Sequence, residues 1–239
     1  MQPLTVTLLQ GATRWHDAEA NRDYYGALVR AHAGATDLFV LPETFLSGFS
    51  NDTRASAETM DGAGVAWLRA LAGEVGAVIT GSLAIREGDT VYNRLLWATP
   101  DGGLLQYDKR HLFRMAGEHT RYGGGSERLI VELKGWRILP QVCYDLRFPV
   151  WLRNRRKEDA VGGMDYDLAL FVANWPAPRR QPWRTLLRAR AIENLSYEPL
   201  VELGTQEQVV SVRIDPAPLL AHRERFPAWM DADEFQLLP

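Results

Sequence analysis

Short apolar runs of strand length alternate with stretches of helical spacing, and this alternation limits the fold more than any other feature. Two hairpins interrupt it, at the PDGG turn of residues 100–103 and the KG turn of residues 134–135. The pattern predicts a mixed-sheet, layered α/β architecture. Strands are expected at residues 4–9, 37–41, 77–85, 92–99, 104–107, 129–133, 136–143, 168–174 and 208–214, and helices at residues 18–33 behind an Asp17 cap, 62–76, 182–197 and 216–225. The charged residues 153–163 are expected to form a surface loop.

The composition excludes several classes of protein. The chain has 239 residues, 46% of them hydrophobic, and its formal net charge is -3, so no basic face for nucleic acid or a membrane surface is expected. No window approaches the roughly 18 apolar residues of a membrane span. The first ten residues do not form a secretory apolar segment, and the single cysteine excludes an internal disulfide. We expect a soluble, cytoplasmic, single-domain protein.

Lysine is scarce in this chain, which makes each lysine informative. Of the 27 basic residues 24 are arginines, and the lysines are Lys109, Lys134 and Lys157. A lysine among reactive neighbours would therefore suggest a position that needs a compact ammonium rather than a planar guanidinium.

The only cysteine, Cys143, lies where an apolar strand ends and a turn leads into the helix-like residues 150–153. A nucleophile on a strand-to-helix turn is accessible, and backbone N–H groups at the start of a helix can stabilise negative charge. The alternative is that Cys143 is a small buried apolar residue, as free cysteines usually are.

Two charged residues share this position at the end of a strand. Glu43 follows residues 37–41, and Lys109 follows residues 104–107. Taken singly, Glu43 or Lys109 would ordinarily be interpreted as a solvated residue at the edge of a sheet. Together with Cys143, however, they indicate an active site at the ends of three strands.

Five blocks in this order resemble the signature of the nitrilase superfamily of carbon–nitrogen hydrolases. The resemblance covers about residues 4–197 and resumes near residue 209. Within the superfamily, the ω-amidase branch is the most similar, because it shares RMAGEH at 114–119 and CYDLR at 143–147. The five blocks are LPETF at 41–45, YDKRHLF at 107–113, VCYDLRFP at 142–149, FVANWP at 171–176 and RARAIEN at 188–194.

The resemblance implies a four-layer α-β-β-α sandwich with two mixed sheets, dimers paired through the helical faces, and a Glu43–Lys109–Cys143 triad. In this interpretation Glu43 removes the thiol proton and Cys143 attacks an amide carbonyl. Lys109 and the backbone N–H of Tyr144 hold the oxyanion, and Glu118 orders Lys109. No metal or other cofactor is required, and the five histidines show no metal-ligand spacing.

The expected activity is release of ammonia from the terminal amide of a small dicarboxylic monoamide, such as 2-oxoglutaramate. Arg147 and Asn174 are the expected substrate-binding residues, because a guanidinium binds a carboxylate bidentately. Arg147 could instead pair with Asp145 or another surface acid. N-carbamoyl amino acids, nitriles and aliphatic amides are alternative substrates, and a non-catalytic scaffold is an alternative function.

The single domain, residues 1–239, departs from the family pattern between residues 197 and 198. Relatives continue there into a strand, a Gly-rich turn with a Gly-Asp-Ser element, and a second strand, so the comparison predicts that about 30 residues are absent. No Gly or Asn closes a helix ending at Tyr197, and Pro199 disfavours a helical Glu198. The unbroken numbering favours a true deletion over a segment left out of this sequence. A Cα–Cα distance of about 3.8 Å between these residues would mark a real peptide bond.

Overall fold

The computed structural model describes residues 1–157, 163–196 and 199–237. Within this part of the chain the strands are β1(Leu4–Gln10), β2(Leu38–Val40), β3(Val78–Glu87), β4(Thr90–Ala98), β5(Leu104–Asp108), β6(Val131–Leu133), β7(Trp136–Val142), β8(Leu168–Val172) and β9(Gln208–Ile214). The helices are α1(Ala18–Ala31), α2(Thr53–Ser56), α3(Ala63–Val75), α4(Pro149–Leu152), α5(Arg180–Glu193) and α6(Pro216–Arg225). None of the described helices is long and apolar enough to cross a membrane.

The strands form two mixed sheets. In the described residues the larger sheet has the order β5-β4-β3-β2-β1-β9, with β1, β2 and β3 parallel and the other pairs antiparallel. The smaller sheet has the order β6-β7-β8, in which β7 and β8 are parallel. The expected hairpins are confirmed, and Lys134 and Gly135 both have positive φ, as a two-residue hairpin turn requires.

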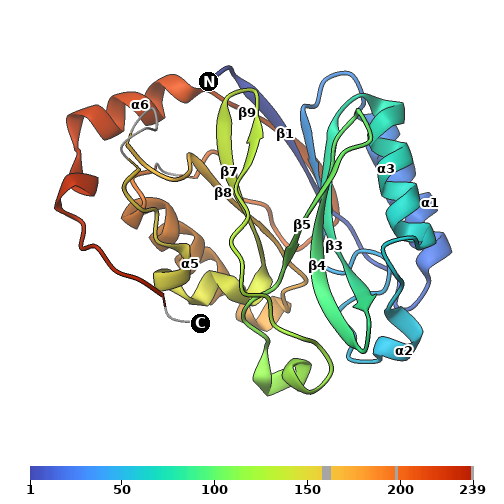
Figure 1. Cartoon of the computed structure of the whole chain (residues 1–239). Helices are drawn as coiled ribbons and strands as arrows, with labels where there is room; N and C mark the ends of the chain where they lie inside the picture. Colours follow the sequence, from blue (N-terminus) through green and yellow to red (C-terminus); the bar gives the residue numbers. More distant parts are fainter. Residues whose placement is uncertain (158–162, 197–198, 238–239) are drawn as a thin grey trace.

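The sheets pack face to face between two helical layers (Figure 1). Helices α1 and α3 cover the outer face of the larger sheet, and α5 and α6 lie beyond the smaller one. One apolar core joins the two sheets, with Trp97 from β4 and Trp136 from β7 each 1% exposed. A second core lies between the larger sheet and α1 and α3. The predicted four-layer α-β-β-α sandwich is therefore confirmed.

The expected end of one helix was wrong. Helix α5 ends at Glu193 rather than Tyr197, because Asn194 caps it and Leu195 adopts a left-handed φ of 59°. The Asn194 side chain donates to the carbonyl of Arg190 and accepts from the backbone N–H of Asn154, both at 2.8 Å. An asparagine thus closes this helix, and the pair 197–198 lies outside the described residues.

The expectation of a surface loop at residues 153–163 was wrong at Asn154, which is 1% exposed. Its side chain exchanges two hydrogen bonds with the backbone of Tyr166, and these bonds compensate its burial. Residues 158–162 of this stretch lie outside the described residues.

The topology brings the ends of several strands to one region. Strands β2 and β5 run in the same direction, so Glu43 and Lys109 emerge from one edge of the larger sheet. Strands β7 and β8 are parallel, so Cys143 and Asn174 emerge from one edge of the smaller sheet. The two edges face each other across the sandwich, where the functional groups meet.

Candidate active site

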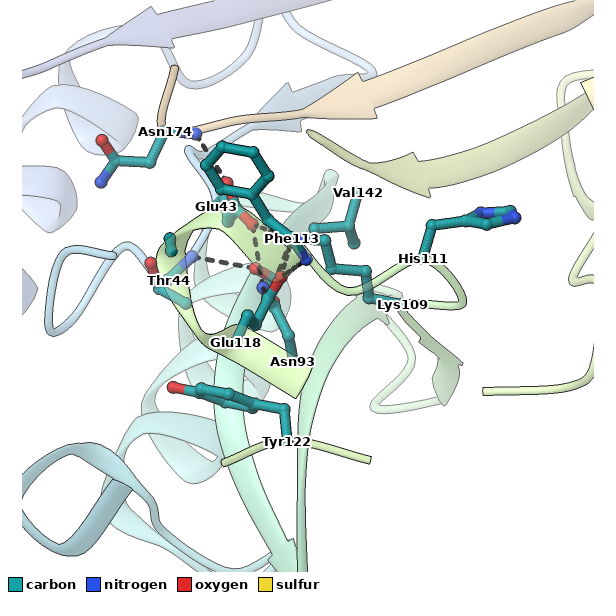
Figure 2. Close-up of polar contacts among 12 residues, drawn as sticks. Glu43, Thr44, Asn93, Lys109, His111, Phe113, Glu118, Tyr122, Val142 and Asn174 are labelled. Atoms are coloured by element: carbon teal, nitrogen blue, oxygen red, sulfur yellow. Dashed lines mark hydrogen bonds and ion pairs between the residues drawn. The ribbon is translucent and has the colours of Figure 1, made fainter. Parts of the chain in front are cut away.

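Glu43 lies completely buried just beyond β2. Thr44, the next residue, has φ of 46°, and its backbone N–H donates to the hydroxyl of Ser82 at 2.9 Å. The Glu43 carboxylate accepts hydrogen bonds from the side-chain amide of Asn93 and the backbone N–H of Asn174, each at 2.9 Å. These contacts fix the carboxylate at the junction of the two sheets (Figure 2).

Lys109 is also completely buried, with its ammonium between two carboxylates. Its Nζ lies 3.0 Å from Glu43 Oε1 and 2.9 Å and 3.0 Å from the two oxygens of Glu118. Burial alone would lower the pKa of Lys109, but the negative charges of Glu43 and Glu118 outweigh it and raise the pKa. Lys109 is therefore a permanent cation.

Glu118 lies in the loop after β5 and holds the ammonium from the other side. Its carboxylate also accepts from the backbone N–H of Phe113 at 2.6 Å and from Asn93 at 3.3 Å. Asn93 thus bridges Glu43 and Glu118 (Figure 2). Asn93 was not predicted from the sequence, although a polar residue within the strand β4 was a usable signal.

Cys143 occupies a strained turn at the end of β7. It has φ of 45°, in the left-handed region that non-glycine residues rarely adopt, and it begins the short 3-10 helix Cys143–Arg147. Such backbone conformations cost about 1–3 kcal/mol and concentrate at functional sites. The turn directs the thiol toward a cavity that Lys109 also lines.

The charges around Cys143 disfavour its thiolate. Burial and the negative charge of Glu43 raise its pKa well above the ordinary value, while Lys109 lowers it only in part. Two carboxylates already share one ammonium, so a resting thiolate would be a third anion. For the thiol to act as a nucleophile its proton would have to leave during the attack, and Glu43 is the adjacent carboxylate that can accept it.

Asp145 connects the cysteine turn to the lysine loop. Its completely buried carboxylate accepts from the Tyr107 hydroxyl at 2.9 Å and from the His111 backbone N–H at 3.0 Å, and it lies 2.7 Å from His111 Nδ1. It also accepts from the backbone N–H of Val142 at 3.2 Å. These bonds fix the segment that carries Cys143 relative to the segment that carries Lys109. This positioning role of Asp145 was not predicted from the sequence.

A cavity of about 330 Å³ opens over Cys143 and Lys109. Aromatic rings form much of its wall, and no Asp or Glu occurs among its described lining residues. The aromatic residues are Trp15, Phe49, Phe113, Tyr144 and Trp175, and the polar ones are Lys109, Cys143, Arg147, Asn174 and Arg179. The cavity is therefore apolar and cationic, with Cys143 in its wall.

The structure brings together all the residues expected at the site. Glu43, Lys109 and Glu118 are in direct contact, and Cys143, Tyr144, Arg147 and Asn174 line the adjoining cavity. The alternative that Arg147 pairs with Asp145 was wrong, because Asp145 binds Tyr107, His111 and Val142 instead. Arg179, which also lines the cavity, was not predicted from the sequence.

Comparisons with known proteins agree with this geometry. The carbon–nitrogen hydrolase family profile matches residues 5–213. The omega-amidase YafV of Yersinia enterocolitica is 43% identical, with 100% of each chain covered, and that alignment extends over 270 positions, 31 more than the 239 residues of this chain. A 2-oxoglutaramate amidase of Bacillus subtilis (strain 168) is 31% identical over 95% of this chain and 96% of that protein.

A solved structure shares both the fold and much of the sequence. The CN-hydrolase superfamily protein XC1258 from Xanthomonas campestris, solved with an arsenic adduct in its active site, has a TM-score of 0.96 and 55% identity. The match covers 99% of this chain and 100% of that one. The chain belongs to the carbon–nitrogen hydrolase family.

The charge on Glu43 raises the pKa of Cys143, so removing that charge should lower it. We expect Glu43→Gln to shift the thiolate absorbance at 240 nm to lower pH. Because the chain has one cysteine, the difference spectrum against Cys143→Ala reports this group alone. The exposed Glu132→Gln is the control and should leave the midpoint unchanged. An unchanged or higher midpoint in Glu43→Gln would contradict the electrostatic assignment.

Proposed function

We propose that this chain is an ω-amidase, which hydrolyses the terminal amide of a small dicarboxylic monoamide such as 2-oxoglutaramate. The observation that carries the proposal is the buried Glu43–Lys109–Glu118 contact beside Cys143, at the wall of an aromatic-lined cavity that also holds Arg147. Similarity to the omega-amidase of Yersinia enterocolitica and the 2-oxoglutaramate amidase of Bacillus subtilis supports the substrate class.

In the proposed first step, the sulfur of Cys143 bonds to the amide carbonyl carbon while its proton moves to Glu43. Lys109 Nζ and the backbone N–H of Tyr144 donate to the oxyanion that forms. Removing one such donor typically costs about 2.7–4 kcal/mol of transition-state stabilisation. Protonation of Glu43 also weakens its hold on the ammonium, which frees an N–H for the oxyanion.

The tetrahedral intermediate then collapses. The carbon–nitrogen bond breaks, Glu43 returns its proton to the departing nitrogen, and ammonia leaves a thioester on Cys143. Water attacks this thioester and gives a proton to Glu43. The carbon–sulfur bond then breaks, Glu43 returns the proton to the sulfur of Cys143, and the carboxylic acid is released. Glu118 keeps Lys109 paired while Glu43 changes its charge.

Arg147 is our candidate for the substrate carboxylate. It is exposed at the cavity, its guanidinium lies 5.4 Å from the centre of the Trp175 ring, and it forms no ion pair with any described residue. Asn174 is the second proposed contact, because its side chain lines the cavity while its backbone N–H binds Glu43. The homodimer and the cytoplasmic location remain predictions.

The first test is ammonia release from 2-oxoglutaramate, compared with glutamine, an N-carbamoyl amino acid and a nitrile. Cys143→Ala should lower kcat by more than about 10⁴-fold, because the described cavity lining holds no other cysteine and no serine or threonine. Lys109→Arg should lower it by about 10²-fold or more, since a guanidinium displaces the oxyanion site. Lys134→Arg is the matched control, because Lys134 pairs with Asp37 on the surface. Wild-type turnover in Cys143→Ala would exclude the mechanism.

Arg147→Ala should raise KM for acidic ω-amides far more than for neutral amides of the same length. The lost charge-assisted contact is worth about 1.5–3 kcal/mol, or about 10- to 150-fold in affinity. The exposed Arg213→Ala on β9 should change neither KM. Equal losses for charged and neutral amides would remove Arg147 from substrate recognition.

We also propose that the chain lacks a strand pair of its family between residues 197 and 198. The 31 positions without a counterpart in the alignment with the Yersinia enterocolitica enzyme support this, as does the position of β8 at the edge of the smaller sheet. The catalytic residues lie upstream and keep their contacts.

Inserting that relative's segment between Tyr197 and Glu198 should therefore raise the thermal midpoint by about 4 °C or more, since each kcal/mol shifts it by about 2–4 °C in a domain of this size. Activity should rise as well. A Gly/Ser linker of equal length is the control and should give neither gain. A graft no better than the linker would count against a missing strand pair.

A further inference from the structure

A second guanidinium lines the cavity beside that of Arg147. Arg179 is half-buried, and its Cζ lies 5.1 Å from the centre of the Phe113 ring. Its one side-chain hydrogen bond is a contact of 3.4 Å to the sulfur of Met115, a weak acceptor. No described carboxylate pairs with it, so most of its N–H donors lack a protein acceptor.

Two other arginines that are shielded from solvent, unlike Arg179, form ion pairs with acidic side chains. Arg94 is 2% exposed and pairs with Asp108 and Glu87, and Arg223 is 3% exposed and pairs with Asp167. Leaving a guanidinium against an aromatic ring without an acid keeps its donors available for a ligand.

Trp175 connects the two cavity arginines. The guanidinium of Arg147 lies over its ring, and its indole N–H donates to the backbone carbonyl of Arg179 at 2.7 Å. Trp175 therefore ties the backbone of one arginine to the side chain of the other. Trp175 therefore fixes the two arginines relative to each other, and they are not independent surface charges.

We propose that Arg179 is a specificity-determining residue that, together with Arg147, binds the 2-oxo acid end of the substrate. This inference rests on the proposed ω-amidase function and extends it. A 2-oxo acid presents three acceptor oxygens, two on the carboxylate and one on the adjacent carbonyl, and it presents no donor. One guanidinium binds two of these oxygens bidentately, and the third requires the second guanidinium.

The same arrangement rejects 2-amino acids. An ammonium at carbon 2 would need an anionic acceptor, whereas the described cavity lining offers two guanidiniums and no Asp or Glu. A buried cation without a partner is strongly disfavoured. Arg179 therefore selects the 2-oxo acid amide over glutamine and over the amide that lacks the oxo group.

The experiment compares kcat/KM for 2-oxoglutaramate with that for glutaramate, the same molecule without the oxo group. In Arg179→Met the ratio of the two should fall by about 10-fold or more, because a hydrogen bond from a charged donor is lost only for the oxo substrate. Arg180→Met removes the neighbouring guanidinium, which donates to the carbonyl of Leu203 instead, and should leave the ratio within about twofold. If the ratio of the two kcat/KM values were unchanged in Arg179→Met, the proposal would be overturned. Arg179 would then only pack against Phe113 and Met115.

A binding measurement separates this inference from the proposed function. In Cys143→Ala, which cannot turn over, calorimetry should find that 2-oxoglutarate binds about 10-fold more tightly than glutarate, and that adding Arg179→Met removes this preference. Such a result would support the role of Arg179 even if the wild-type enzyme released no ammonia from 2-oxoglutaramate. Equal Kd values for the two diacids in Cys143→Ala would overturn the proposal, whatever the amidase assay shows.

Discussion

The ammonium of Lys109, enclosed by the carboxylates of Glu43 and Glu118, is the interaction on which the rest of the site depends. Removing three charges from water costs several kcal/mol for each ion, and their mutual attraction offsets this only with close contacts and additional hydrogen bonds. Asn93 and the backbone N–H groups of Phe113 and Asn174 supply those bonds. The cluster therefore forms only when the two sheets and the loop after β5 are correctly assembled.

This cluster also determines the charge that surrounds Cys143, the proposed nucleophile. One ammonium between two carboxylates leaves a net charge of about -1, so the protein keeps Cys143 as a thiol until a substrate arrives. The left-handed turns at Thr44 and Cys143 place the acid and the nucleophile against each other at a cost in backbone strain. Both features lower stability locally, and the packed core between the sheets, centred on Trp97 and Trp136, provides the rigid support.

The sequence predicted those parts of the molecule that have a local signal. Apolar runs, turn residues and caps located most elements, and strand ends bearing Glu43, Lys109 and Cys143 located the site. Asn93 was missed because its role depends on two carboxylates from distant segments that meet only in the folded chain. Arg179 was missed because one arginine among 24 shows no sign, before folding, of lacking an acidic partner. The end of α5 was misplaced because the Asn194 cap is completed by Asn154, 40 residues away.

The distribution of charge in the cavity also orients a substrate before any chemistry. Lys109, in the cavity wall, belongs to a cluster of net negative charge behind that wall, while Arg147 and Arg179 add two positive charges to the lining, on aromatic supports. A substrate carboxylate placed toward Glu43 and Glu118 would be repelled, and the apolar walls between would strengthen that repulsion. The same carboxylate at the arginines is attracted, which leaves the uncharged amide facing Cys143. An ω-amide of a small acid is therefore the kind of molecule whose charge pattern matches both ends of the cavity, whereas a neutral amide or nitrile gains nothing from the arginines.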